Sequence, residues 1–252
     1  MPVLSARSRG NSITLQIIIY LIGAALADLF GAWLFLLRKR WEAEPLRLLI
    51  GAGAGFLLAV ALLEMAPHAA GMIPTAPVWL LGGFLLVHVV EHVVPAHFHY
   101  GHETHSGLQP HVGVTATAGL TIHSLLDGVA IVAALQADSW LGGMVFAAMV
   151  WHRIPSGFTV ASVVRAVGGS PGSAMLAAGV LGVAAVLGGL LWLALPQGRW
   201  LGAALSVSAG SLLYVAATDL LPEVNRRRTL LAPLGVVIGV GVYYVIHLGF
   251  GH

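Results

Sequence analysis

The stretch Ile13–Leu37 reads ITLQIIIYLIGAALADLFGAWLFLL and contains one charged residue, Asp28. A helix needs about 20 consecutive, mostly apolar residues to cross the hydrocarbon core of a bilayer. The stretch is longer than the apolar region of a secretory signal peptide, and no small-residue cleavage site follows it. We therefore expect Ile13–Leu37 to form a first transmembrane helix.

The composition of the whole chain agrees with this expectation. Hydrophobic residues make up 58% of the sequence and charged residues 9%, whereas soluble domains carry about a quarter charged residues. The formal charge of +2 is too small to indicate a nucleic-acid partner. The chain has no cysteine and 12 histidines, so any metal site must use nitrogen and oxygen ligands.

Further apolar segments of similar length follow the first one, and we predict eight membrane spans in a single transmembrane domain, residues 1–252. The fold class is therefore an all-α integral membrane protein. The spans lie near residues 13–37, 46–66, 77–97, 112–136, 140–165, 173–195, 200–222 and 232–250.

The charges of the connecting loops predict the orientation, because Lys and Arg accumulate on the cytoplasmic side. Eight of them lie in alternate loops: Arg38, Lys39, Arg40, Arg47, Arg165, Arg226, Arg227 and Arg228. The other side holds Arg7, Arg9 and Arg199. Both termini are therefore expected outside, and the cytoplasmic (inner) membrane of a prokaryote is the expected location.

Two segments of the chain repeat each other. Ala54–His68 reads AGFLLAVALLEMAPH, and Ala209–Glu223 reads AGSLLYVAATDLLPE. They fall in the second and seventh spans, which cross the membrane in opposite directions. The pattern predicts an inverted repeat, spans 1–3 and 6–8, around a central pair of spans 4 and 5, as in many secondary transporters.

Polar residues gather in those two central spans, where a charged group is costly and needs a reason. His123 and Asp127 are four residues apart and share one helical face, and His152 lies near the middle of the fifth span. Two imidazoles and a carboxylate suit a four-coordinate zinc, with water or Ser124 completing the shell. Pro155 is expected to open the fifth span and free a carbonyl group. The alternative is a hydrogen bond between His123 and Asp127 that joins helices without a metal.

These motifs, in this order, resemble those of the ZIP (Zrt/Irt-like) family of divalent metal transporters, in its prokaryotic type. The matching stretches are His123-x-x-x-Asp127-Gly128, His152-x-x-Pro155-x-Gly157, Leu213–Glu223 and Leu63–His68, the last with the usual His and Glu exchanged. The resemblance covers nearly the whole chain. It implies transport of the metal toward the cytoplasm.

The chain also departs from the family pattern. Many members have two adjacent metal sites bridged by carboxylates. Here Ser156 stands where a Glu is frequent, Ser124 where an Asn is frequent, and Arg153 at a position that can be a ligand. A guanidinium cannot bind a cation, so we expect one central metal, with Arg153 as a fixed positive charge that pairs with Asp127 in the empty site. Snorkelling of Arg153 to an interface is the alternative.

Further polar residues outline a path for the metal. Glu64 and His68 form a candidate entrance. Asp219 and Glu223 form a candidate exit together with His88, Glu91 and His92, for which helix capping and packing are equally open. The loop after the third span carries His97, His99, His102 and His105. It is interpreted as a metal-binding segment, with a merely solvated linker as the alternative.

The leading functional hypothesis is transport of divalent transition metals by alternating access. Zinc is the first candidate, with iron, manganese, cadmium, cobalt and nickel open. The metal is the transported substrate, and no catalytic cofactor is expected. The predicted partners are the metal ion, the lipid bilayer and, as an option, a second copy in a homodimer. The alternatives are a membrane-embedded zinc-dependent hydrolase and a metal sensor without flux. No His-Glu-x-x-His helix motif supports the hydrolase.

Overall fold

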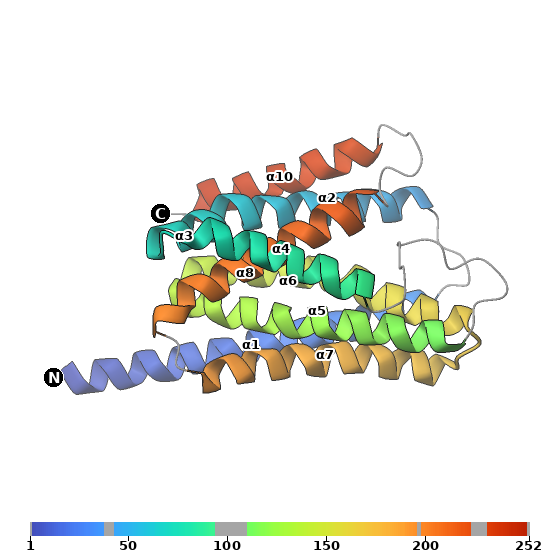
Figure 1. Cartoon of the computed structure of the whole chain (residues 1–252), viewed down its shortest axis with the longest axis horizontal. Coiled ribbons are helices and arrows are strands. Elements are labelled where there is room, and N and C mark those ends of the chain that lie inside the picture. Colours follow the sequence, from blue (N-terminus) through green and yellow to red (C-terminus); the bar gives the residue numbers. More distant parts are fainter. Residues whose placement is uncertain (1, 38–42, 94–109, 196–197, 223–230, 251–252) are drawn as a thin grey trace.

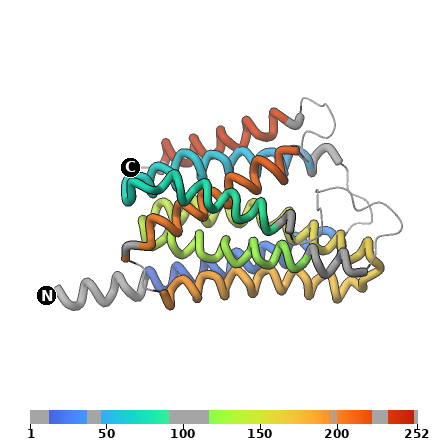
Figure 2. The backbone as a smooth tube through the Cα atoms, viewed as in Figure 1, coloured from blue at the N-terminus to red at the C-terminus, as the bar shows by residue number. Residues whose placement is uncertain are grey.

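A computed structural model describes residues 2–37, 43–93, 110–195, 198–222 and 231–250, and these residues contain helices and no strand. The helices run back and forth along one common axis (Figure 1), and the tube in Figure 2 follows the same path. Their bounds are α1 Pro2–Leu37, α2 Ala43–Ala59, η1 Val60–Met65, α3 Ala66–Met72, α4 Ala76–Val93, α5 Pro110–Ala137, α6 Ser139–Ala166, α7 Pro171–Ala194, η2 Gly198–Trp200, α8 Leu201–Tyr214, η3 Val215–Leu220 and α10 Leu231–Phe250.

Several of these elements join end to end. Ala59 and Met65 keep right-handed helical backbone angles, so α2, the π-helix η1 and α3 form one rod. Tyr214 likewise joins α8 to the π-helix η3. Within the described residues this leaves eight rods, which match the eight predicted spans in order.

Hydropathy marks most of these rods as membrane spans. By length and composition, five helical segments of the described residues can cross a membrane: Ile13–Leu37, Arg47–Met72, Thr117–Ala137, Pro171–Ala194 and Leu201–Leu220. Ala76–Val90 and Pro233–Gly249 are shorter apolar helices. Helix α6 is in neither set, and its middle holds the polar residues His152, Arg153 and Ser156.

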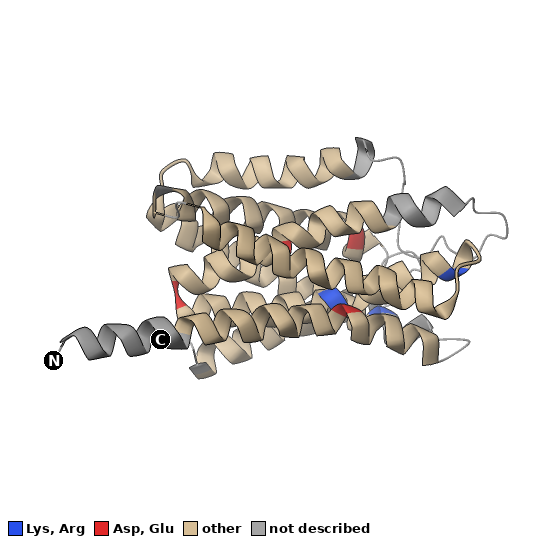
Figure 3. Cartoon of the chain, turned by 90° about the horizontal axis from the view of Figure 1, so that it is seen from below, with Lys and Arg blue, Asp and Glu red and all other residues tan. Residues whose placement is uncertain are grey.

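The surface of the bundle is apolar, and several polar and charged side chains are buried within its mostly apolar core. Leu15, Val245 and Leu248 are 58%, 73% and 81% exposed, while Asp28 and Arg153 are buried. Few charged residues interrupt the described helices in Figure 3. A lipid-facing exterior explains this distribution, because apolar side chains need no burial in a bilayer.

The helices form two groups. Helices α1, α5, α6 and α7 pack on one another, and the rods of α2, α4, α8 and α10 make the second group (Figure 1). Within each group the packing is built on matched pairs: α1 on α6 and α7 on α5 in the first, α2 on α10 and α8 on α4 in the second.

Glycine permits the close approach of α1 to α6. A methyl group on Gly157 would collide with the carbonyl oxygen of Asp28, and one on Gly31 would collide with that of Ile154. The α5–α7 contact has the same form, with Gly128 against the carbonyl of Ala185 and Gly188 against that of Leu125. Small residues at such contacts let helix backbones touch in membranes.

Helix α6 is uninterrupted and begins after a single residue that follows α5. Helix α6 continues through Pro155 as one α-helix, so the predicted opening of the helix at this proline is wrong. The predicted fourth and fifth spans, residues 112–136 and 140–165, leave only a short connection, and the structure has one: Asp138 alone separates α5 from α6. The Asp138 side chain caps α6 by accepting from Leu141 N at 3.0 Å.

Candidate metal site

Three potential metal ligands meet where α5 faces α6. His123 and Asp127 come from α5 and His152 from α6, and one ligand atom from each lies within 4.8 Å of the others. Nε2 of His123 is 3.2 Å from Nε2 of His152 and 3.4 Å from Oδ1 of Asp127. The four-residue spacing places the two α5 ligands on one face, as the sequence predicts.

The group is enclosed by the bundle. His123, Asp127 and His152 are 8%, 3% and 2% exposed. Nδ1 of each histidine is buried and has no hydrogen-bond partner among the described residues. The Nε2 atoms are therefore the ones aimed at a shared point.

This donor set fits a divalent transition metal. Two imidazole nitrogens and one carboxylate oxygen are the ligands of three-residue zinc sites that keep a further position open. An imidazole-rich set also accepts other first-row divalent ions, so the ligands alone do not select zinc. The two facing Nε2 atoms cannot both act as acceptors toward each other, so a proton or a cation must lie between them.

The two serines predicted near the metal, Ser156 and Ser124, make different contacts. The Ser156 hydroxyl lies 3.4 Å from Nε2 of His152 and donates to the His152 carbonyl at 3.2 Å. This places an oxygen next to the ligand atoms. Ser124 is buried, and its carbonyl accepts from Arg153 at 3.2 Å. Whether either hydroxyl binds metal stays a prediction.

A guanidinium occupies the other side of Asp127. Arg153 is 1% exposed, and its Nη2 donates to Oδ2 of Asp127 at 3.1 Å. Its Nη1 donates to Oδ2 of Asp28, which comes from α1. The contact expected between Arg153 and Asp127 is present, and this arginine does not snorkel to an interface. The Asp28 contact was not predicted.

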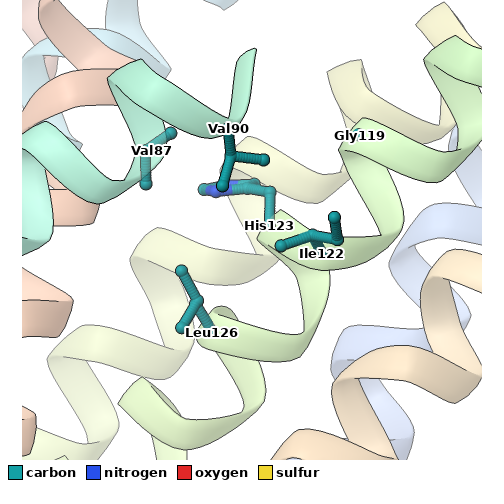
Figure 4. A pocket seen from close by; sticks show the side chains of 6 residues that line it. All are labelled: Val87, Val90, Gly119, Ile122, His123 and Leu126. Carbon is teal, nitrogen blue, oxygen red and sulfur yellow. The ribbon is translucent and has the colours of Figure 1, made fainter. Parts of the chain in front are cut away.

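A small pocket adjoins the site on the side of α4. It measures about 10 Å³ and is lined by Val87, Val90, Gly119, Ile122, His123 and Leu126. Figure 4 shows the His123 ring reaching toward the α4 residues Val87 and Val90. Such a volume holds about one water molecule. On the side that faces α4, the candidate metal site therefore has room beside it for only about one water molecule.

The predicted entrance residue Glu64 contacts residues of α6 and α10, for which the sequence analysis made no prediction. Its Oε1 accepts from the Tyr243 hydroxyl at 3.0 Å and from Trp140 Nε1 at 3.4 Å, and lies 2.8 Å from Nδ1 of His247. His68 is half-buried on the same rod. His247 carried no predicted role, although a histidine near the end of a span was the available signal.

The predicted exit residues are only partly described. Asp219 is half-buried on η3, where Thr218 donates to it at 3.2 Å. His88 is exposed on α4 and lies edge-on to Tyr214, with ring centroids 5.8 Å apart. The remaining predicted residues lie outside the described residues, or their side chains do: Glu91, His92, His97, His99, His102, His105 and Glu223.

Apolar helices around a buried His/Asp group define the class of the protein: an integral membrane protein with an intramembrane site of metal-binding type. Residues 101–247 match the family model described as the ZIP zinc transporter. The zinc transporter ZupT of Escherichia coli O7:K1 is 30% identical over 223 residues, covering 81% of this chain and 85% of the relative. The chain belongs to the ZIP zinc transporter family.

Other relatives agree. Zinc transporter ZupT of Escherichia fergusonii is 29% identical over 214 residues, covering 79% of this chain and 82% of the relative. Zinc transporter ZIP9 of Micropogonias undulatus is 31% identical over 156 residues, covering 58% of this chain and 50% of the relative. The family resemblance drawn from the four motifs is confirmed.

Proposed function

We propose that this protein transports divalent transition-metal ions across a membrane through the His123/Asp127/His152 site. One observation carries the proposal: three ligand atoms within 4.8 Å of one another are buried among helices with a lipid-facing surface. Polar groups at such a depth are costly unless they pair or bind an ion. Membership in the ZIP family supports the same reading.

Zinc is the first candidate for the transported ion. The relatives named above are zinc transporters, and two imidazoles with a carboxylate suit zinc. Iron, manganese, cadmium, cobalt and nickel remain candidates because nitrogen and oxygen ligands bind them as well. The Ser156 hydroxyl lies 3.4 Å from Nε2 of His152, and Ser156 and Ser124 are the candidate residues for a further ligand position, which water can also fill.

We further propose that the chain is an inverted repeat. The π-helices η1 and η3 begin at Val60 and Val215, which occupy the same place in the two repeated segments. The matched helix packing supports this: α2 meets α10 as α8 meets α4, and α1 meets α6 as α7 meets α5. Such an arrangement places a binding site between related halves.

Alternating access then follows from the two helix groups. The three ligands belong to the group of α1, α5, α6 and α7, and the His123 ring faces α4 of the other group (Figure 4). Relative movement of the two groups would expose the site first to one side of the membrane and then to the other. The small pocket at His123 agrees with a site that opens only by such movement.

We also propose a direction for the transport of the metal and a location for the protein. The loop charges favour termini outside and an inner-membrane location, and the first turn of α1 and the last turn of α10 lie at the same end in Figure 1. Helix α3, which carries His68, lies at that end in Figure 1, and Glu64 belongs to η1, which directly precedes α3. The two residues would then attract metal from outside. Asp219, Glu223, His88, Glu91 and His92 would receive it on the cytoplasmic side.

The remaining proposals concern organisation. We propose that residues 1–252 form a single transport domain and that the His97–His105 loop is a cytoplasmic metal-binding segment. Assembly of two copies into a homodimer is a further option.

The hydrolase alternative needs a general base near a metal-bound water. Asp127 is the only carboxylate in the three-ligand group of the described residues, and it is engaged by Arg153.

Purified protein in liposomes tests the function directly. The account predicts uptake of Zn²⁺ and Cd²⁺ that depends on the protein, with no hydrolysis of lipid or peptide. Metal binding without uptake would indicate a sensor, and metal-dependent hydrolysis without uptake would indicate an enzyme. Either result would overturn the transport proposal.

A further inference from the structure

A single guanidinium joins two carboxylates from different helices beside the metal-type site. Arg153 of α6 donates to Asp127 of α5 and to Asp28 of α1. We infer that Asp28 is a positioning residue: it retains the Arg153 guanidinium when a metal ion displaces that guanidinium from Asp127. This inference rests on the proposed function, because it concerns how the transported ion gains its carboxylate ligand.

Asp127 faces two competitors. Its Oδ1 lies 3.4 Å from His123 Nε2, on the side of the ligand group, and its Oδ2 accepts from Arg153 at 3.1 Å. A divalent ion bound to His123 and His152 would draw electron density from the carboxylate and repel the guanidinium. Arg153 must then have another partner, because an unpaired buried charge is strongly unfavourable.

Asp28 meets that need. It is fully buried, its Oδ2 already accepts from Nη1 of Arg153, and its Oδ1 has no hydrogen-bond partner in the described part of the chain. Nε of Arg153 is also without a partner there. A small shift of the guanidinium can therefore replace the Asp127 contact with a second contact to Asp28.

The charge balance leads to the same role. The two carboxylates and the guanidinium sum to −1, and a divalent ion changes this to +1. Without the Asp28 charge the values would be 0 and +2. These side chains are at most 3% exposed, so water screens them little and the additional positive charge would oppose metal binding.

A comparison of the two central helices argues against a purely structural ion pair. The α5 sequence His123–Gly128 and the α6 sequence His152–Gly157 align, so that Arg153 corresponds to Ser124. Gly157 meets the carbonyl of Asp28 just as Gly128 meets the carbonyl of Ala185. In the α5–α7 contact, Ser124 and Ala185 take the places that Arg153 and Asp28 have in the α1–α6 contact. The α5–α7 contact forms without an ion pair at these places, so this type of helix contact does not need one.

The close approach at Gly157 also keeps Asp28 beside Arg153. Because α1, α5 and α6 belong to the same helix group, the three charged groups would move together during transport. Asp28 is therefore available to Arg153 in every state of the site.

The test is Cd²⁺ titration of the purified full-length protein by calorimetry, with Asp28→Asn, Arg153→Met and the double variant. The site charges without metal are 0, −2 and −1 respectively. Relative to the wild type, the Cd²⁺ dissociation constant should rise at least about tenfold in Asp28→Asn and fall at least about tenfold in Arg153→Met. Charge alone would return the double variant to the wild-type value, because the two effects would then add. If Asp28 acts by retaining the guanidinium, it has nothing to retain once Arg153 is gone, so the double variant should bind Cd²⁺ more than about threefold more tightly than the wild type. A return to the wild-type value would overturn the positioning role.

Asp138→Asn serves as the matched control. Asp138 caps α6 far along the helix from Arg153, and asparagine caps helices equally well. This variant should bind Cd²⁺ like the wild type. If Asp28→Asn does not fold, Arg153→Met carries the test, and a dissociation constant equal to that of the wild type would overturn the inference.

The outcomes separate this inference from the proposed function. In the first outcome, the wild type binds Cd²⁺, His123→Ala does not, and both Asp28→Asn and Arg153→Met bind as tightly as the wild type. The metal site would then stand, and the role of Asp28 would be overturned. In the second outcome, the wild type shows no Cd²⁺ binding that His123→Ala removes, which would overturn the proposed function and the inference with it.

Discussion

Nε2 of His123 on α5 lies 3.2 Å from Nε2 of His152 on α6. The two rings meet edge to face, with centroids 5.4 Å apart. Two imidazoles in this geometry share one proton or one cation, and Asp127 Oδ1 lies 3.4 Å from the same His123 nitrogen. The site is thus prepared for a cation before one arrives, which agrees with a transported ion that must bind and leave.

The central site should hold one metal ion. Two divalent ions a few ångströms apart repel strongly unless carboxylates bridge them. Here Ser156 offers no charge and Arg153 adds a positive one. Anomalous diffraction or metal titration should find a single ion per chain at the three ligands. The variant with Ser156→Glu and Arg153→Asp should bind a second ion beside it. Two bridged ions in the unaltered protein would show that the single-site account is wrong.

The glycine contact between α1 and α6 should be essential. Gly157→Ala would drive a methyl group into the carbonyl of Asp28, and neither helix backbone can yield cheaply. We expect a loss of stability of about 1–3 kcal/mol or more, with lower metal flux in the protein that still folds. Gly143→Ala on the same helix is the control, because its methyl group would meet only the Tyr20 hydroxyl at 3.8 Å. Equal thermal stability of the two variants would refute the close contact.

Glu64 should affect how readily the protein captures the metal ion from solution more than how fast the ion crosses the membrane once bound. Glu64 lies 2.8 Å from Nδ1 of His247, and a carboxylate near an entrance raises the local cation concentration. Glu64→Gln should lower the flux at low metal concentration several-fold and leave the maximal rate nearly unchanged, with the difference shrinking at high salt. Initial rates at two ionic strengths measure this. A lower maximal rate with an unchanged half-saturating concentration would contradict an entrance role.

The His-rich loop should not be obligatory. Replacing His97, His99, His102 and His105 together should preserve transport at saturating metal and change only its dependence on metal concentration, because the proposed path lies through the helices. Uptake into liposomes over a range of zinc concentrations measures both. Complete loss of flux at saturating zinc would place the loop in the path.

Periodicity and hydropathy were sufficient to predict the eight rods, their order and the ligand face of α5. The span lengths follow from the thickness of a bilayer, and the His123–Asp127 pairing follows from helix geometry alone. The predicted opening at Pro155 was wrong: α6 continues as an α-helix on both sides of the proline. Surrounding helices can stabilise such a residue within a helix.

The partners of Asp28 and Glu64 could not be predicted from the sequence. Asp28 was recognisable as the single charge in Ile13–Leu37, but which face of α1 meets α6 depends on the backbone contacts at Gly31 and Gly157. Glu64 was grouped with His68 because they share a rod, whereas its observed contacts, Tyr243 and His247, come from the other end of the sequence. Contacts of this range depend on tertiary packing, which local patterns do not encode.

Metal flux through single-residue variants tests the central claim most directly. His123→Ala, Asp127→Ala and His152→Ala should each be reconstituted in liposomes beside the wild type and beside Asp138→Asn, with folding checked by size-exclusion chromatography. The account predicts that each of the three variants folds and loses most of its Zn²⁺ and Cd²⁺ flux, because each supplies one of the three converging ligand atoms. Flux near that of the wild type in any one of them would contradict the assignment of this site.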